Sequence, residues 1–274
     1  MKFSMNVEYL ARCASLERAA ESIAKAGFEC VDYSPKTDID NWKEKMEQDL
    51  RIFEKTGLKL HQSHSPMFRY TWKPPVKEQI SRLIEATAYA GGKYMVVHGD
   101  EFDFENLEYS PERAFEYNHD LFAPFVEQAE KCGIKIAFET VFEDYFSVHR
   151  GRPRFSSKFD DLKKLIESFN SDAVCCCWDF GHAQVEYKDK HAENIRKMGS
   201  YIECMHMHDS DFDLDTHLVP FLGKIDWKEC MTALKETGYN GIINLEFAHG
   251  KVPEKVMDVY TKYLIETAKA VVAL

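Results

Sequence analysis

Long hydrophobic runs are missing from this sequence. No segment of its 274 residues approaches the ~18 to 20 consecutive apolar residues of a membrane-spanning helix. The opening residues, MKFSMNVEYLARC, also lack the uninterrupted apolar stretch of a secretory signal. We therefore expect a cytoplasmic protein with no membrane partner.

A cysteine framework and a surplus of positive charge are also absent. None of the eight cysteines lies in a CxxC pair, and Cys175, Cys176 and Cys177 are consecutive within an apolar run. Such cysteines behave as small hydrophobic residues, so disulfides are not expected. The 46 acidic residues outnumber the 35 basic ones, which gives a formal net charge of −11. This balance disfavours a surface that binds nucleic acid.

The sequence does contain an alternation of short apolar runs with longer segments of helical periodicity. For example, Leu16, Ala19, Ala20 and Ile23 share one helical face, which needs a sheet to cover. The predicted strands are residues 2–6, 28–33, 58–64, 94–98, 135–140, 174–180, 202–208 and 241–247. The glycines at expected helix ends are Gly27, Gly57, Gly91, Gly133, Gly199 and Gly238.

Eight strand–helix units predict a (β/α)8 TIM barrel. Dividing 274 residues by 8 leaves about 34 per unit, enough for a strand, a helix and two loops. No linker, low-complexity tract or internal repeat divides the chain, so residues 1–274 are predicted to form one domain. The alternative, a doubly wound open sheet, is disfavoured because no GxGxxG or GxxxxGK[ST] turn follows any strand.

Ionisable residues stand near the carboxyl ends of six consecutive predicted strands. In a parallel barrel the strands are buried on both faces, so such a side chain must be paired, ligated or functional. The residues are His61, His64, His98, Glu139, Asp179, His182, His206, His208, Asp209 and Glu246.

The alternation of side chains along a strand orients the carboxylates. Glu139, Asp179 and Glu246 point into the predicted barrel, whereas Phe138 and Leu245 face the helices. Converging carboxylates repel one another unless a cation lies between them. Together with histidine they form a mixed oxygen and nitrogen ligand set, which suits Mn²⁺, Mg²⁺, Co²⁺ or Zn²⁺. The sequence thus predicts one bound divalent metal ion.

Motifs at these strand ends resemble the xylose isomerase-like TIM-barrel superfamily, which holds sugar isomerases and epimerases, inosose dehydratases and the endonuclease IV family. The motifs are IAFET around Glu139, WDFGHA from Trp178, HMHD from His206, DTH from Asp215, and NLEF ending the eighth strand. The resemblance covers nearly the whole chain. It implies a metal-dependent isomerase or epimerase of a sugar or sugar phosphate.

The resemblance also implies roles for single residues. Glu139, Asp179, His206 and Glu246 would bind the metal, with His182 beside it contacting substrate or a ligand residue. In the epimerases of the superfamily the two glutamates also exchange the sugar's proton, so Glu139 and Glu246 are the predicted acid/base pair. The role is chemically reasonable because a proton next to a carbonyl needs a base, and the developing enediolate oxygens need positive charge nearby.

Further residues match the additional zinc ligands of endonuclease IV-type enzymes, namely His64, His98, Asp215 and His217. We interpret these four and His182 as contacts to substrate hydroxyls or as a second metal position. A DNA-repair nuclease is disfavoured because the net charge is −11, and because the loop at 99–108 carries five acidic residues. The opening residues also lack the first motif of the endonucleases. We expect a small sugar or polyol as the partner and no nucleic acid.

Several alternatives stay open. Loss of water after the same proton abstraction would define an inosose dehydratase-like lyase, and a barrel without chemistry would be a ligand-binding protein. Arg150, Arg152 and Arg154 follow the fifth strand and could meet a substrate phosphate, solvent or another subunit. The loop at 65–75, with three aromatic residues, could cover a sugar or form the surface of a homo-oligomer.

Overall fold

The computed structural model describes residues 1–66, 74–99, 110–143, 154–211, 213–247 and 250–274. Within them eight strands form one parallel sheet in the order β7-β6-β5-β4-β3-β2-β1-β8. The strands are β1 (Phe3–Asn6), β2 (Cys30–Asp32), β3 (Lys59–His64), β4 (Tyr94–Val97), β5 (Lys135–Glu139), β6 (Val174–Asp179), β7 (Ile202–His206) and β8 (Ile243–Leu245). Each lies within one of the eight predicted runs.

The sheet closes on itself. β1 pairs in parallel with both β2 and β8. Between β7 and β8 the Met207 amide donates to the Asn244 carbonyl at 2.7 Å, and the Glu246 amide donates to the Met207 carbonyl at 3.2 Å. The eight strands therefore form a nearly closed barrel. The open-sheet alternative is wrong, because an open sheet leaves its two end strands unpaired with each other.

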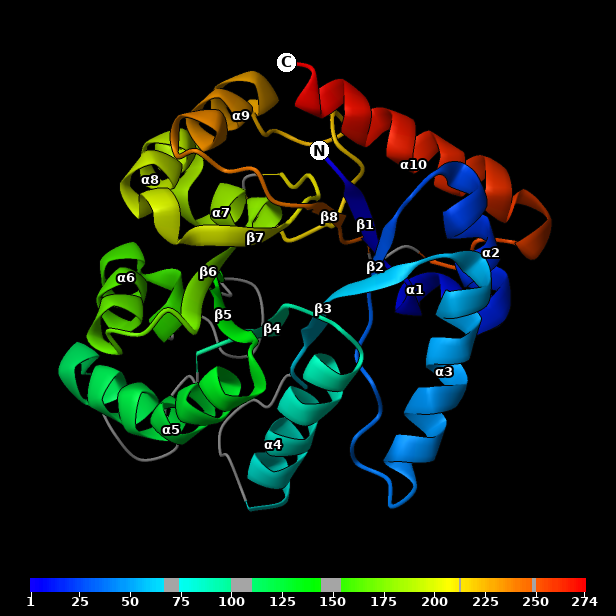
Figure 1. Cartoon of the computed structure of the whole chain (residues 1–274). Coiled ribbons are helices and arrows are strands. Elements are labelled where there is room, and N and C mark those ends of the chain that lie inside the picture. The colour runs from blue at the N-terminus through cyan, green and yellow to red at the C-terminus, as the bar shows by residue number, and fades with distance from the viewer. Residues whose placement is uncertain (67–73, 100–109, 144–153, 212, 248–249) are drawn as a thin grey trace.

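Helices form a ring around the strands (Figure 1). They are α1 (Glu8–Ala11), α2 (Leu16–Ala26), α3 (Trp42–Thr56), α4 (Pro74–Tyr89), α5 (Pro111–Cys132), α6 (Phe159–Ser168), α7 (Phe180–Tyr187), α8 (His191–Met198), α9 (Trp227–Glu236) and α10 (Met257–Val272). Two of them, α1 and α7, are short additions to the eight predicted units, since each precedes a second helix of the same unit. Among the described residues no helix is both long and apolar enough to span a membrane.

The helix boundaries follow the local signals in the sequence. α2, α3 and α5 end at Gly27, Gly57 and Gly133, all in the left-handed conformation that a side chain disfavours. α5 begins after Ser110, whose hydroxyl accepts a hydrogen bond from the first turn, and Pro111 occupies the first turn. All six predicted glycines have a positive φ.

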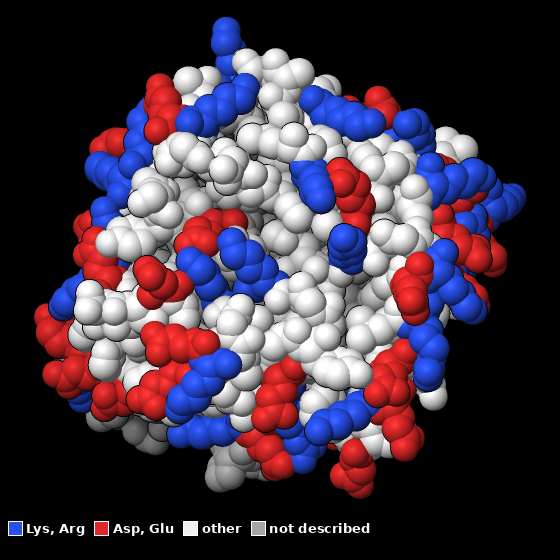
Figure 2. Space-filling model, in the orientation of Figure 1, with Lys and Arg blue, Asp and Glu red and all other residues white. Residues whose placement is uncertain are grey.

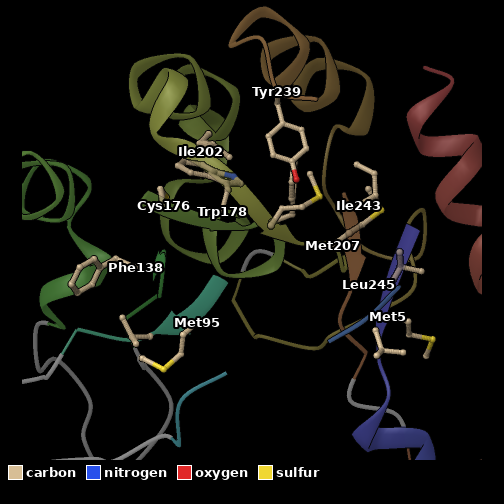
Figure 3. Packing of buried hydrophobic residues seen from close by; sticks show 14 of the residues in the cluster. Met5, Met95, Phe138, Cys176, Trp178, Ile202, Met207, Tyr239, Ile243 and Leu245 are labelled. Atoms are coloured by element: carbon tan, nitrogen blue, oxygen red, sulfur yellow. The ribbon is translucent and has the colours of Figure 1, made fainter. Parts of the chain in front are cut away.

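The core has an outer and an inner part. Phe138 and Leu245 point from the strands toward the helices, as alternation predicted, and Trp178 does the same; all three are fully buried there (Figure 3). A smaller inner cluster holds Tyr94, Val96, Ala137, Cys175, Cys177 and Cys204. All eight cysteines are free, and burial raises the pKa of the Cys176 thiol well above its usual value. The Cys176 thiol is therefore an unreactive packing residue.

Charges of both signs are interspersed over the face that Figure 2 shows. Basic side chains on this face therefore alternate with acidic ones and do not form a continuous patch.

Candidate metal centre

The carboxyl ends of β5 to β8 bring the four predicted metal ligands together. Each of Glu139, Asp179, His206 and Glu246 offers a ligand atom, and these atoms lie within 4.8 Å of one another. His206 Nδ1 is 2.9 Å from both Glu139 Oε1 and Glu246 Oε2, and 3.5 Å from Asp179 Oδ2. All four side chains are buried. We call these residues the central group.

Strand register accounts for this convergence. Asp179 is paired with His206 across β6 and β7, and Glu139 is paired with Cys177, two residues before Asp179 on the same face. Since side chains two residues apart share a face, Glu139 and Asp179 both point inward. The Asp179 carboxylate also caps α7, where it accepts a hydrogen bond from the His182 amide at 2.6 Å.

Glu139 also belongs to a second cluster. His64 Nε2 and His98 Nε2 lie 2.9 and 2.8 Å from Glu139 Oε2, the oxygen that faces away from His206. Burial lowers the pKa of His64, but the hydrogen bond and charge of Glu139 outweigh it and raise the pKa to about 9. His64, His98 and Glu139 form the β3–β4 group.

A third cluster lies on the other side of Asp179. His182 Nε2 and His217 Nε2 are 3.4 and 3.0 Å from Asp215 Oδ2, and His208 Nδ1 is 3.9 Å from Asp215 Oδ1. The rings of His208 and His217 stack with their centroids 4.0 Å apart. We call His182, His208, Asp215 and His217 the β7-loop group. The residues that the sequence placed in a single second set thus divide between two groups.

His208 is the residue of this group for which no role was predicted from the sequence. It is fully buried, its Nε2 lies 2.9 Å from Asp179 Oδ1, and its Nδ1 has no hydrogen-bond partner among the residues that the structure describes. The signal that could have found it is Gly181 in the WDFGH motif. A Cβ at Gly181 would lie 1.8 Å from His208 Cε1, so the glycine makes room for the ring.

A polar layer behind His206 was also missed. Gln62 Nε2 lies 2.7 Å from His206 Nε2 and donates to Asp32 Oδ2 at 3.2 Å, and Asn244 Nδ2 donates to the same oxygen at 3.1 Å. Burial raises the pKa of Asp32 to about 6, against the lowering effect of His206. These residues come from β2, β3 and β8, and the sequence signal is a polar residue at an inward strand position.

The electrostatics fit a cation. Burial raises the pKa of Glu139, but His206 and His98 outweigh it and hold the pKa well below its usual range. Burial also raises the pKa of Asp179, and His182 and His208 again reverse the shift. These carboxylates are therefore ionised. Ionised oxygens next to imidazole nitrogens make a donor set suited to a divalent metal. Two atoms of this set, His208 Nδ1 and Asp215 Oδ1, are buried and have no hydrogen-bond partner within the described part of the chain.

Other predicted contacts are only partly covered by the structure. Arg154 donates to the Phe142 carbonyl at 3.1 Å and lies over the Phe142 ring. Arg150, Arg152, the acidic residues at 100–108 and the aromatic residues at 68–72 lie outside the described residues. A phosphate contact and an aromatic cover or subunit surface thus stay predictions.

Comparison with known proteins places the fold in a family. A family model described as xylose isomerase-like TIM barrel matches residues 20–263. The chain belongs to this family. An uncharacterized protein of Sinorhizobium fredii is 22% identical over 266 residues, covering 84% of this chain and 80% of that protein. An uncharacterized protein of Methanocaldococcus jannaschii is 27% identical over 152 residues, or 54% of this chain and 48% of that protein.

Solved structures with the same xylose isomerase-like fold include sugar epimerases. A D-tagatose 3-epimerase-like protein has a TM-score of 0.77 at 21% identity and covers 100% of this chain and 98% of its own. A D-psicose 3-epimerase in the presence of D-fructose has a TM-score of 0.78 at 15% identity, and the match covers 99% of both chains. The IolI protein with a bound zinc atom has a TM-score of 0.80 at 19% identity, and the match covers 100% of this chain and 98% of that protein. At these identities the likeness concerns the fold.

Proposed function

We propose that this chain is a divalent-metal-dependent isomerase or epimerase of a sugar or sugar phosphate. The observation that carries the proposal is the pair of buried glutamates from β5 and β8, each 2.9 Å from His206 Nδ1 within one ligand set. Two such carboxylates can lie on either side of one bound molecule. The epimerase names of several proteins with this fold support the same reading.

The central group would hold the cation, which when bound supplies positive charge beside the substrate oxygens. The chain's own residues carry the proton chemistry. One glutamate, Glu139 or Glu246, accepts the proton from the carbon next to the carbonyl, and a proton is then returned to carbon. Return to the same carbon from the opposite face gives an epimer. Return to the former carbonyl carbon, with the neighbouring hydroxyl proton passing to the former carbonyl oxygen, gives an isomer.

The two flanking groups would serve the same substrate. We assign the β7-loop group to a second cation or to substrate hydroxyls, because it combines three imidazoles with one carboxylate. His64 and His98 would contact hydroxyls beside Glu139 or hold a further cation. The single domain over residues 1–274, the cytoplasmic location, a homo-oligomer and the absence of nucleic-acid binding stay predictions.

A lyase is the second candidate. His182 Nδ1 lies 3.4 Å from Glu139 Oε1, and its Nε2 lies 3.4 Å from Asp215 Oδ2. A histidine between two carboxylates beside the base can protonate a departing hydroxyl, as dehydration requires. The same proton abstraction would then end in loss of water.

The test is a substrate screen in D₂O with the metal-loaded protein across ketoses, aldoses and inososes. We expect deuterium at one carbon of one substrate, and no incorporation after the metal has been removed with a chelator. A product lighter by one water identifies the lyase. If no compound exchanges and the purified protein binds neither Mn²⁺ nor Zn²⁺, the chain is a ligand-binding barrel and the proposal fails.

A further inference from the structure

Asp209 follows β7 and is fully buried, yet it belongs to none of the three groups. Its Oδ1 accepts hydrogen bonds from the amides of Ser210 at 2.9 Å and Ile225 at 3.2 Å. Its Oδ2 accepts from the Phe221 amide and from Trp227 Nε1, both at 2.9 Å. One carboxylate thus accepts from four N–H donors, of which two come from the far part of the loop between β7 and α9 and one from Trp227, the first residue of α9.

The backbone of Asp209 holds the middle of the same loop. Its amide donates to the Leu218 carbonyl and its carbonyl accepts from the Leu218 amide, both at 2.7 Å. Leu218 directly follows His217, so these two hydrogen bonds place the His217 part of the described segment 213–226 against the end of β7. Gly223 completes the contact, because a Cβ there would lie 2.2 Å from Asp209 Oδ1.

The segment held in this way is strained. His217 and Phe221 have φ values of 44° and 75°, the left-handed region that residues other than glycine rarely adopt. Such strain persists only where surrounding contacts impose it. With His217 in this conformation its ring stacks on His208 and its Nε2 lies 3.0 Å from Asp215 Oδ2. The strained backbone therefore positions Asp215 and His217 within the β7-loop group.

We propose that Asp209 is the positioning residue of a cation site at the β7-loop group. It holds segment 213–226 in the strained conformation that brings Asp215 and His217 against His182 and His208. The inference rests on the proposed function, since it assigns a cation to one group of the proposed active site.

The position requires a carboxylate and not merely a polar side chain. Each oxygen of Asp209 accepts two N–H groups, and a carboxylate has only acceptors to offer. Asparagine has the same shape, but its NH₂ group would face two N–H donors and leave both unpartnered. Asp209→Asn is therefore a small change in volume that removes the restraint on the segment.

The experiment titrates the metal-free protein with Co²⁺ and records its visible absorption, together with the bound metal after dialysis. The His217→Ala variant identifies which molar equivalent of bound Co²⁺ belongs to the β7-loop group, because that equivalent is lost when His217 is removed. In Asp209→Asn we expect the affinity of this equivalent to fall about 10- to 100-fold, as when a group that orients a ligand is removed. The equivalent at the central group keeps its affinity and its spectrum.

A matched control is Asp49→Asn. Asp49 is also a buried carboxylate, 2% exposed, and accepts a hydrogen bond from the Tyr33 hydroxyl at 2.5 Å, but it lies on α3 outside the three groups. This variant lowers thermal stability without changing either Co²⁺ affinity. Gly223→Ala keeps the Asp209 carboxylate while crowding it, and is expected to reproduce the selective loss even if Asp209→Asn does not fold.

Wild-type affinity for both equivalents in Gly223→Ala and in any folded Asp209→Asn would overturn the inference. So would a Co²⁺ stoichiometry that His217→Ala leaves unchanged, because no cation would then bind at the β7-loop group. Both results leave the proposed function standing. That function fails separately, if the protein with a filled central group exchanges no substrate proton in D₂O.

Discussion

The fit between Gly181 and His208 gives a quantitative test of how the site is packed. In Gly181→Ala the new Cβ would lie 1.8 Å from His208 Cε1, whereas ordinary contacts begin at 3.4 Å. The ring would have to move by 3.4 − 1.8 = 1.6 Å if the backbone stayed in place. Such a shift breaks the contact of His208 Nε2 with Asp179, now 2.9 Å, and disturbs the stack on His217.

Two opposing effects set the magnitude. Loss of a hydrogen bond to a charged group costs about 1.5 to 3 kcal/mol, and forced overpacking adds about 1 to 3 kcal/mol. Alanine within a helix recovers about 1 kcal/mol relative to glycine. Gly181 has no positive φ, so no further conformational cost arises. We expect a net loss of roughly 1.5 to 5 kcal/mol in the free energy of unfolding.

The assay is urea unfolding of the metal-free protein, with Gly133→Ala as the control. Gly133 has a φ of +73°, and no atom of the described residues lies within 4 Å of the position that a Cβ would take. Its substitution therefore lowers the free energy of unfolding only through the backbone conformation, by about 1 kcal/mol. Gly181→Ala is also expected to weaken Co²⁺ binding at the β7-loop group. A Gly181→Ala protein as stable as the wild type would show that the ring of His208 is not confined as described.

Four further predictions follow from the site and its surroundings. A crystal structure with Mn²⁺ should show one ion ~2.0 to 2.4 Å from the ligand atoms of the central group. Glu246→Gln should retain metal but lose at least ~10² in kcat, measured by steady-state kinetics, because an amide accepts no proton. Burial and the charge of Asp32 raise the pKa of Glu8 to about 7 from 4.5. The folded state therefore favours the protonated form of Glu8. The contribution of this group to stability is fully present below pH 4.5 and is lost as the pH rises through about 7. Urea unfolding should accordingly show that Glu8→Gln loses less stability than the wild type between pH 5 and 8. Finally, an abasic oligonucleotide should stay intact at low salt with Zn²⁺; incision that Glu139→Ala abolishes would instead indicate DNA repair.

Much of the fold could be predicted because a parallel barrel leaves a strong signal in the sequence. Its strands are covered on both faces, so each appears as a short, nearly continuous apolar run, and β6 is the clearest case. The boundary was less accurate. The run at 174–180 extends one residue beyond β6, because the Asp179 carboxylate caps α7 and Phe180 is already helical.

The central group was predictable for a related reason. Alternation alone turned Glu139, Asp179 and Glu246 inward, and barrel closure brings the ends of their strands together. The polar layer behind His206 was not predictable in the same way. The role of Asp32 and Gln62 depends on hydrogen bonds to residues of other strands. In the sequence, a single polar residue in an apolar run is equally consistent with a hydrogen-bonded core residue that has no role at a site.

The three groups are linked through two shared carboxylates. Glu139 presents Oε1 to His206 and Oε2 to His64 and His98. Asp179 also links two groups, since its Oδ2 lies 3.5 Å from His206 Nδ1 and its Oδ1 and Oδ2 lie 2.9 and 3.0 Å from His208 Nε2. Substituting either carboxylate therefore disturbs two groups at once, and its effects will not add to those of a neighbouring substitution.

Residues that belong to one group are better probes of it. Among the side-chain carboxylates of the described residues, His98 lies within 4 Å of Glu139 and His217 within 4 Å of Asp215. A comparison of His98→Ala with His217→Ala can consequently separate the two flanking groups while all ligands of the central group stay in place. If the flanking groups hold substrate hydroxyls, both variants raise KM; if they hold cations, both lower the bound metal. The two readouts thus distinguish a substrate-binding role from a metal-binding role for each flanking group.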